Sequence, residues 1–381
     1  MTSGNTDWSK YTITDLTTLK GKRVILRLDL NLPYDKGQIT DRTRLDEVIP
    51  FIKQLSFAGA KIIILSHFGE KGESIKPVAD LVVKSLSGIK FVEGIDIENI
   101  RKEIDSLPLG DGVIIENTRM FVGEKDNTSS CARNFASLGD VFINDAFSAS
   151  HRNHASIVGI TDYILSYFGP TFIKEITNLS AASHPEKPAL LIIGGAKIST
   201  KLNLIRNYLD QGVKVFVGGA MVHNIFKERG LEIGESFYDP TYSAPASLYN
   251  HPLLITPTDV VLLDGKEVSV DKIPKGGVVV DCGKTTLKNL DEEIQKSKTI
   301  IVNGPLGLYE KGFYYGTEHM LTSVANAIGV KTYIGGGDTV LVAEKAHVLK
   351  KFSFVSLGGG AMLDYLANGT LPGINAVTKS K

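Results

Sequence analysis

Short runs of β-branched and other apolar residues alternate with longer amphipathic segments along almost the whole 381-residue chain. This alternation is typical of parallel βαβ units, in which helices cover both faces of a sheet. We therefore expect an α/β fold with two doubly wound parallel sheets. The strands expected in the first half are Arg23–Leu30, Ala60–Ser66, Gly112–Glu116 and Asp140–Asn144, and those in the second half are Ala189–Ile193, Val213–Val217, Asp259–Leu263, Thr299–Val302, Thr332–Ile334 and Phe352–Ser356.

The length predicts more than one hydrophobic core, because single cores stop growing beyond about 250–300 residues. We expect a first domain at 1–168 and a second at 189–368. Between them, 169–188 combines a helix-like run that starts at Pro170 with a polar, proline-containing stretch, which indicates a connecting helix and hinge. Pro372 and Gly373 should end the last helix of the second domain, so that the tail, about 369–381, could pack back on the first.

The chain carries 42 Lys and Arg against 42 Asp and Glu, so its formal charge is zero. General attraction to nucleic acid or to an anionic membrane is therefore not expected. The two cysteines, Cys131 and Cys282, are too few for a disulfide framework and fit a reducing compartment. The polar start at 1–5 lacks the features of a secretory signal, and no apolar run reaches 18 residues. We expect a cytoplasmic protein without a membrane span.

In open α/β sheets, ligands bind beyond the carboxyl ends of the strands. In the first half, these positions hold Asp29, Asn31, Ser66, His67, Glu116, Arg119, Asn144 and Asp145, with Arg44, Arg152 and His154 soon after. A guanidinium can hold phosphate or carboxylate through two hydrogen bonds, so the arginines of this region, Arg27 included, favour a site for a small anionic substrate. Taken alone, His67 is more often a structural histidine, although its place beside Gly69 makes it a fair ligand, and His154 can be either.

The strand ends of the second half carry glycine instead. Two triplets, Gly335–Gly337 and Gly358–Gly360, each follow an apolar run and precede a helix-like segment. Glycines let the backbone approach an anion, and the first N–H groups of a helix are unpaired and lie at the positive end of its dipole. Neither triplet forms a P-loop or a dinucleotide-binding fingerprint, so it is their repetition that indicates a site for nucleotide phosphates.

Three charged side chains complete this second site. Lys197 and Lys201 are four residues apart, so we expect both on one face of the helix that follows the strand, either as phosphate ligands or as a basic surface stripe. Asp338 follows three glycines. It could bind Mg²⁺ on a nucleotide, since Mg²⁺ normally takes one or two protein carboxylates plus phosphate oxygens, or it could be a helix N-cap.

An anion site in one domain and a nucleotide site in the other predict phosphoryl transfer between them. Such a transfer needs positioning and charge neutralisation rather than a side-chain nucleophile. We expect Lys197, Arg44 and the N–H groups of Gly358–Gly360 to stabilise the moving phosphoryl group. A cleft between the domains would have to close to exclude water, which makes the connecting segment a hinge.

Several motifs appear together in a fixed order from about residue 20 to the end. They are Arg27-Leu28-Asp29-Leu30-Asn31-Leu32-Pro33, Ser66-His67-Phe68-Gly69, Glu116-Asn117-Thr118-Arg119, Asn144-Asp145-Ala146-Phe147, His151-Arg152-Asn153-His154, Gly194-Gly195-Ala196-Lys197, Asn303-Gly304-Pro305-Leu306-Gly307 and both glycine triplets. In these motifs the sequence resembles the phosphoglycerate kinase family. The resemblance implies two Rossmann-like domains and reversible, Mg²⁺-dependent phosphoryl transfer between 1,3-bisphosphoglycerate with ADP and 3-phosphoglycerate with ATP, in glycolysis and gluconeogenesis, by a cytosolic monomer.

Carried over by position, the resemblance assigns roles to individual residues. The residues that would hold the phosphoglycerate are Arg27, Asp29, Leu30, Asn31, Arg44, His67, Phe68, Gly69, Glu70, Arg119 and Arg152. Those that would contact the nucleotide are Lys197, Lys201, Glu310 at the ribose, Gly336, Gly337, Asp338 through Mg²⁺, and Thr339. Lys197 and Arg44 would stabilise the phosphoryl group, which the turn at Gly358, Gly359 and Gly360 would receive.

A few positions depart from the family pattern. Glu70 stands where the family usually has arginine and adds a negative charge beside the anion site. Leu357 and Val302 replace a usual threonine and tryptophan, and no proline follows Gly283. A family member that binds nucleotide or protein after losing catalysis is therefore the alternative to an active kinase. A dinucleotide-dependent dehydrogenase on a similar fold is a third hypothesis, which the missing fingerprint disfavours.

Overall fold

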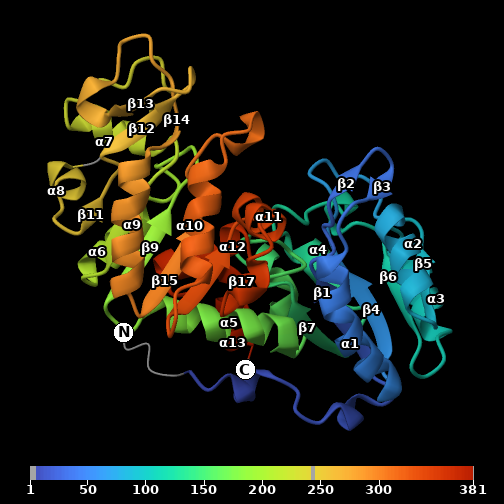
Figure 1. Cartoon of the computed structure of the whole chain (residues 1–381). Helices are drawn as coiled ribbons and strands as arrows, with labels where there is room; N and C mark the ends of the chain where they lie inside the picture. Colours follow the sequence, from blue (N-terminus) through green and yellow to red (C-terminus); the bar gives the residue numbers. More distant parts are fainter. Residues whose placement is uncertain (1–5, 242–244, 381) are drawn as a thin grey trace. The chain divides into compact units, whose positions relative to one another are not determined.

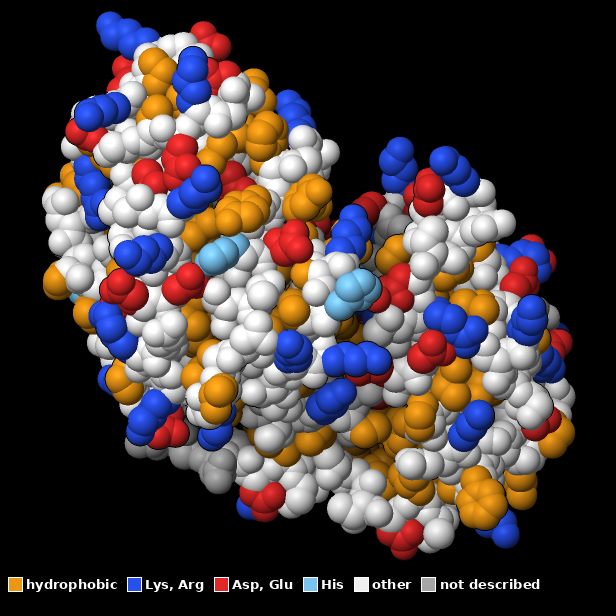
Figure 2. All heavy atoms as spheres, in the orientation of Figure 1, with side chains coloured by type: hydrophobic (Ala, Val, Ile, Leu, Met, Phe, Trp, Pro, Cys, Tyr) orange, Lys and Arg blue, Asp and Glu red, His pale blue; other side chains and the backbone are white. Residues whose placement is uncertain are grey.

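The computed structural model describes residues 6–241 and 245–380, so the polar start at 1–5 lies outside the described residues. The chain forms two compact units, Met1–Thr177 with Thr370–Lys381, and Asn178–Gly369 (Figure 1). Each unit is built around its own six-stranded sheet. Basic and acidic side chains are interspersed over the face shown in Figure 2, as expected for zero formal charge.

The first unit contains a six-stranded parallel sheet in the order β5-β6-β4-β1-β7-β8. Its strands are β1 (Arg23–Leu28), β4 (Lys61–Leu65), β5 (Ile89–Val92), β6 (Gly112–Ile115), β7 (Val141–Asp145) and β8 (Ser166–Phe168). The four strands expected from the sequence are therefore confirmed. The edge strands β5, of four residues, and β8, of three, were not expected from the sequence.

Helices cover both faces of this sheet, as the alternation of elements predicts. The helices are α1 (Thr43–Phe57), α2 (Lys76–Ser85), α3 (Ile97–Asp105) and α4 (Ser129–Ala136). Successive side chains of a strand point to opposite faces, so Val24 and Leu26 of β1 join one core with α1 and α2, and Ile25 joins another with α3 and α4. A short hairpin, β2 (Tyr34–Asp35) and β3 (Gln38–Ile39), follows β1.

The second unit contains another six-stranded parallel sheet, in the order β11-β10-β9-β15-β16-β17. Its strands are β9 (Ala189–Ile193), β10 (Lys214–Val217), β11 (Leu254–Ile255), β15 (Thr299–Asn303), β16 (Lys331–Gly335) and β17 (Phe354–Ser356). Its helices are α6 (Leu202–Asp210), α7 (Val222–Glu228), α8 (Ala246–Tyr249), α9 (Lys284–Lys296), α10 (Tyr315–Ala325), α11 (Gly337–Lys345) and α12 (Gly360–Asn368). Apolar residues of α9, α10 and α11 share one core with β9, β15 and β16.

One expected strand does not belong to a parallel sheet. β12 (Asp259–Leu262) lies in a separate antiparallel sheet between β13 (Glu267–Ser269) and β14 (Val279–Cys282). Placing Asp259–Leu263 in the doubly wound pattern was therefore wrong. A four-residue apolar run carries no information about the direction of its partner, and here a short connection to β13 allows antiparallel pairing.

The expected connecting helix is present as α5 (Pro170–Ser183), which begins at the predicted proline. The carboxylate of Asp145, at the end of β7, accepts a hydrogen bond from the Phe172 backbone N–H at 2.8 Å and so binds the first turn of α5. The final helix, α13 (Pro372–Lys379), belongs to the first unit, where the Gly373 N–H donates to the Ser150 carbonyl at 2.9 Å. Among the described residues, no helix is long and apolar enough to span a membrane.

Candidate active site

Polar residues gather at the carboxyl edge of the sheet in the first unit. Asp29 follows β1, His67 follows β4, Arg119 follows β6 and Arg152 follows β7. The carboxyl ends of parallel strands share one edge, so side chains far apart in the sequence meet there. Arg44 joins them from the first turn of α1. We call these five residues the anion cluster.

Asp29 orients Arg44 within the anion cluster. Arg44 Nη1 lies 2.8 Å from Asp29 Oδ2 and donates to the Asn31 carbonyl at 3.1 Å. Asp29 also accepts hydrogen bonds from the Ser148 hydroxyl and, at 3.1 Å, from the Asn31 N–H. Burial opposes ionisation of Asp29, yet Arg44 and these bonds outweigh it and hold the pKa of Asp29 below its ordinary value. Ser148 was not expected from the sequence.

His67 lies between two arginines. Its Nδ1 is 3.3 Å from Arg27 Nη2 and its Nε2 is 3.3 Å from Arg152 Nη1. Burial, together with the neighbouring guanidinium groups, lowers the pKa of His67 well below its ordinary value. The imidazole is therefore neutral at pH 7 and contributes hydrogen bonds rather than charge.

Arg27 lies beneath the anion cluster instead of in it. Its side chain is 1% exposed, donates to Ser156 Oγ at 3.1 Å and to the Leu28 carbonyl, and reaches His67 with its remaining nitrogen. Burial lowers the pKa of Arg27 to about 10, still well above neutral pH. Arg27 thereby holds the His67 ring in place, and its expected contact with a substrate stays a prediction.

A buried carboxylate supports Arg27 in turn. Glu124 is 1% exposed and accepts hydrogen bonds from the Ser156 hydroxyl at 2.6 Å and the Ser156 N–H at 2.8 Å. Burial raises the pKa of Glu124, while Ser156 and Arg27 favour its ionised form. His154 Nδ1 lies 3.9 Å from the same carboxylate, and burial lowers its pKa to about 4. Glu124 was not expected from the sequence, because it belongs to none of the recognised motifs.

Glu70 pairs with the most buried arginine of the cluster. Arg119 Nη1 lies 2.9 Å from Glu70 Oε2 and donates to the Gly69 carbonyl. The Arg119 side chain is 3% exposed, whereas that of Glu70 is 76% exposed. Lys125 Nζ donates to the Glu70 carbonyl at 3.2 Å. Glu70 therefore presents a carboxylate to Arg119 from the solvent side, where an anionic ligand would be expected to approach.

Other expected substrate residues support the loops by packing and backbone contacts. Leu30 is fully buried, and its N–H donates to Ser66 Oγ at 2.9 Å. Phe68 is also buried, stacks edge-on against Tyr34, and has backbone bonds to Asn117. The substrate contacts expected of Leu30 and Phe68 stay a prediction. Asn31 Oδ1 accepts from the Gly69 N–H at 2.9 Å and so joins two of the strand-end loops.

In the second unit, several strand-end glycines are required for close packing between loops. The Gly195 N–H donates to the Pro305 carbonyl at 3.0 Å, and a Cβ added at Gly194 would meet the Pro305 carbonyl oxygen at 2.1 Å. A Cβ at Gly219 would meet backbone atoms of Gly195 at 2.6 Å. These glycines therefore allow three loops to cross, which is a structural role that the sequence analysis did not separate from phosphate binding.

The two lysines expected at the phosphate site, Lys197 and Lys201, do not share a helical face. Both precede α6, whose N-cap is Lys201, so the expectation of an i, i+4 pair on the helix was wrong. Lys197 is exposed. Lys201 Nζ instead donates to the Gly194 carbonyl at 2.6 Å and to Asn303 Oδ1 at 3.2 Å. Burial lowers the pKa of Lys201 to about 8, an effect that the charge of Asp338 opposes.

The glycine triplets do lead into helices, as expected. α11 begins at Gly337 after Gly336 with φ +93°, and α12 begins at Gly360 after Gly359 with φ +53°. A Cβ built on Gly337 or Gly359 would meet no atom within 4 Å. Their backbones therefore border open space, whereas a Cβ at Gly335 would meet Met362 Sδ at 2.2 Å. Thr339 is buried and accepts from the Gly304 N–H at 2.8 Å.

A cavity of about 240 Å³ lies beside these loops. Its apolar walls include Val222, Phe237, Val260 and Val280, and Glu310 and Asp338 are among its polar lining residues. Mostly apolar walls with a few polar groups suit the flat ring of a small ligand. We call this space the loop cavity.

Asp338 is one of the carboxylates that line the loop cavity and could hold a metal ion. Its Oδ1 accepts a hydrogen bond from the Tyr309 hydroxyl at 2.6 Å. In the described part of the chain, no group of three or more His, Cys, Asp or Glu side chains is arranged to hold a metal. A single carboxylate is sufficient for Mg²⁺ that arrives with nucleotide phosphates, so Asp338 fits such an ion. The Tyr309 contact was not expected from the sequence.

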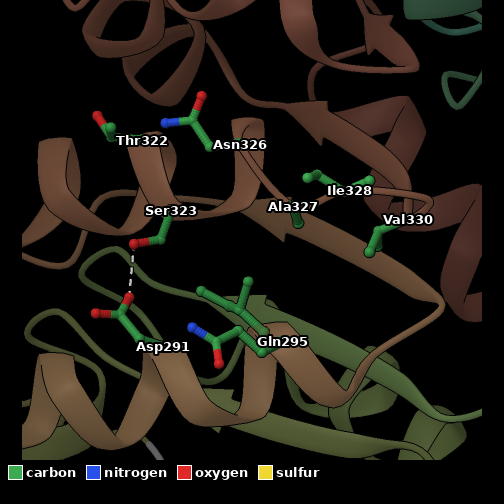
Figure 3. Close-up of a pocket in the computed structure, with 9 residues that line it drawn as sticks. Asp291, Gln295, Thr322, Ser323, Asn326, Ala327, Ile328 and Val330 are labelled. Atoms are coloured by element: carbon green, nitrogen blue, oxygen red, sulfur yellow. Dashed lines mark hydrogen bonds between the residues drawn. The ribbon is translucent and has the colours of Figure 1, made fainter.

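A second cavity, of about 450 Å³, lies between α9 and α10 (Figure 3). Asp291 of α9 faces Ser323 of α10 across it, and the Ser323 hydroxyl donates to Asp291 Oδ1 at 2.6 Å. None of the residues predicted for a site lines this cavity. It is larger than the loop cavity but lies away from the carboxyl ends of the strands.

A family model, curated relatives and solved structures all relate this chain to phosphoglycerate kinases. A family model described as phosphoglycerate kinase matches residues 13–369. The phosphoglycerate kinase of Fervidobacterium nodosum is 38% identical, over 98% of this chain and 99% of that protein, and that of Synechococcus elongatus is 37% identical, over 97% and 99%. The solved structure of phosphoglycerate kinase from Coxiella burnetii is similar with a TM-score of 0.83 at 31% identity, covering 95% of this chain and 97% of that one. The structure from Pyrococcus horikoshii has a TM-score of 0.81 at 25% identity, with the same coverage.

Proposed function

The chain belongs to the phosphoglycerate kinase family, and from this premise we propose that it catalyses reversible phosphoryl transfer between 1,3-bisphosphoglycerate with ADP and 3-phosphoglycerate with ATP. The observation that carries the proposal is the anion cluster, in which Arg44, Arg119 and Arg152 contact residues of the strand-end loops on one edge of the sheet. Three guanidinium groups suit a small substrate with two anionic ends, such as a phosphoglycerate.

On the substrate side, we assign direct contacts to Arg44, Arg119, Arg152, His67 and Asn31. The neutral His67 offers a hydrogen bond without adding charge, and the Asp29 carboxylate fixes Arg44. Asp29 can also accept a hydrogen bond from a substrate hydroxyl, because its pKa is lowered and it stays ionised at neutral pH. Gly69 and Glu70 border the same position.

On the nucleotide side, we assign the ring of ADP or ATP to the apolar part of the loop cavity, and the ribose to Glu310. The phosphates would lie at the N-terminus of α11, with backbone N–H groups of Gly336, Gly337 and Thr339 nearby, because such N–H groups are unpaired and favour anions. Asp338 would hold Mg²⁺, which neutralises phosphate charge when bound.

We assign the transfer itself to positive charge and backbone dipoles. Lys197 is exposed and its side chain makes no hydrogen bond or ion pair with a described residue, so it can approach a phosphoryl group. The turn at Gly358–Gly360 offers a second stabilising element through the N–H groups of Gly359 and Gly360 at the start of α12, whereas the Gly358 N–H donates to Ser356 Oγ at 3.1 Å. Arg44 offers a third from the other unit. Lys201 supports the loops from within through Gly194 and Asn303, and also contributes positive charge near the phosphates.

Transfer requires both substrates to be held together and shielded from water. We propose that 1–168 with the tail at about 369–381 forms the phosphoglycerate domain, that 189–368 forms the nucleotide domain, and that 169–188, which contains all of α5, is the hinge. We further propose that the enzyme acts as a monomer in the cytoplasm. The support for these assignments is the family membership and the chemistry of the two sites.

The test is a steady-state assay with 3-phosphoglycerate and ATP in the presence of Mg²⁺, coupled to a reaction that consumes 1,3-bisphosphoglycerate. We expect turnover that depends on both substrates and on the metal. Folded protein that binds ATP without measurable turnover would contradict the proposal and favour a binding protein that has lost catalysis.

A further inference from the structure

Tyr309 is held firmly at the edge of the loop cavity. It follows β15 and starts a single turn of 3₁₀ helix, Tyr309–Lys311, which closes on Gly312 with φ +89°. The Leu308 N–H before it donates to the Val280 carbonyl at 2.8 Å, and the Tyr309 ring packs against the apolar core of the unit. The position of the Tyr309 ring is therefore set by the fold of the loop.

Its hydroxyl reaches across to a different loop. The Tyr309 hydroxyl lies 2.6 Å from Asp338 Oδ1, and Asp338 is in the first turn of α11, after β16. Below this contact, the Gly304 N–H donates to Thr339 Oγ1 at 2.8 Å, so the same two loops are joined twice. The bond between Gly304 and Thr339 connects buried residues, whereas the bond from Tyr309 involves the exposed carboxylate of Asp338.

An exposed aspartate is normally free to change rotamer, which costs affinity when a ligand has to immobilise it. The Tyr309 hydroxyl removes much of that freedom by binding one carboxylate oxygen. Asp338 Oδ2 accepts no hydrogen bond from a described residue and is left to bind a cation. In metal sites, groups that hydrogen-bond a ligand in this way fix its orientation and raise metal affinity.

We propose that Tyr309 is a positioning residue for nucleotide-bound Mg²⁺, because its hydroxyl holds the Asp338 carboxylate in place for the metal. The proposal rests on the proposed function, since it takes Asp338 as the metal-binding carboxylate. It adds a requirement for the hydroxyl at position 309, where an apolar ring would line the loop cavity equally well.

The test compares ADP binding by calorimetry with and without Mg²⁺, using the full chain. In Tyr309→Phe, we expect the enhancement of ADP affinity by Mg²⁺ to fall by about threefold to tenfold. Loss of a hydrogen bond to a metal ligand typically lowers metal affinity by about tenfold or more, and the expected effect is at or below that value. Affinity for Mg²⁺-free ADP should stay within about twofold, because the ring is retained. Tyr314→Phe, which removes the hydroxyl of a tyrosine that is 51% exposed in the same segment, is the matched control and should behave as the wild type.

A double-mutant cycle with Asp338→Asn separates the possible failures. If Tyr309 acts through Asp338, Asp338→Asn should remove most of the Mg²⁺ enhancement, and Tyr309→Phe in that background should have no further effect. An unchanged enhancement in Tyr309→Phe, or equal weakening with and without Mg²⁺, would overturn the role of Tyr309 alone. An Asp338→Asn variant that keeps the full enhancement would instead overturn the assignment of the metal to Asp338.

Discussion

The charge at position 70 provides a sharp test of how the anion cluster binds substrate. Glu70 pairs with Arg119 at 2.9 Å from the solvent side. A phosphoglycerate that binds Arg119 must therefore displace this carboxylate or bind beside it. Replacing Glu70 by Gln removes the charge while keeping the size of the side chain, and replacing it by Arg reverses the charge.

The size of the effect follows from exposure. Two unit charges about 4 Å apart interact by about 1 kcal/mol in a water-like environment and about 4 kcal/mol near a protein surface. The Glu70 side chain is 76% exposed, so the lower figure applies. We expect Glu70→Gln to tighten 3-phosphoglycerate binding by about 1 kcal/mol, or about fivefold, and Glu70→Arg by about 2 kcal/mol, or about thirtyfold.

Calorimetric titration of 3-phosphoglycerate at two ionic strengths is the assay. The gain in affinity should shrink at higher salt, because exposed charges are screened. Asp80→Asn, which removes an exposed charge on α2, is the control and should change the affinity little. Changes below twofold in both Glu70 variants would refute the reasoning by showing that the carboxylate does not act on the bound substrate. Weaker binding in Glu70→Gln would show that Glu70 itself holds the substrate.

The remaining predictions concern three other residues. Lys197→Ala should lower kcat by about 10²–10³ with ATP affinity within about threefold, as steady-state kinetics and calorimetry can show, and an equal loss in both would make Lys197 a ground-state binding residue. Lys201 has a pKa lowered to about 8, so its ammonium group is charged at pH 7 and loses its proton as the pH rises to 9. The affinity for Mg²⁺-free ADP should therefore fall between pH 7 and pH 9. If a Lys201→Met variant showed the same dependence of ADP affinity on pH, Lys201 would be ruled out as its cause. Glu124→Gln should reduce the free energy of unfolding by about 1–3 kcal/mol in urea titrations, because the buried Arg27 loses a nearby negative charge. The exposed Glu98→Gln should stay within about 0.5 kcal/mol, and an equal loss in both variants would contradict the role of burial.

The sequence predicts the parallel sheets well, because their strands are buried on both faces and appear as continuous apolar runs. β1, β4, β9 and β15 lie in the middle of their sheets and were all expected. The edge strand β11 has only two residues and leaves no comparable pattern. β12 was recognised as a strand but placed in the wrong sheet, since pairing direction depends on connections rather than on composition.

The site is only partly predictable. Strand-end position brings Asp29, His67 and Arg152 to one edge, as expected from the general rule for α/β sheets. The depth of each residue is not encoded in its position along the chain, so the burial of Arg27 could not be predicted. Contacts between segments that are distant in the sequence could not be predicted either, such as the hydrogen bond from Tyr309 to Asp338, 29 residues away.

The central claim is that the two units take different substrates. Amide hydrogen exchange, measured on the full chain with each ligand separately, tests it most directly. We predict that 3-phosphoglycerate slows exchange at 66–75 and 147–156, and that ADP with Mg²⁺ slows exchange at 303–310 and 336–345. Protection of the same segments by either ligand, or protection of the two sets in the reverse order, would contradict the account.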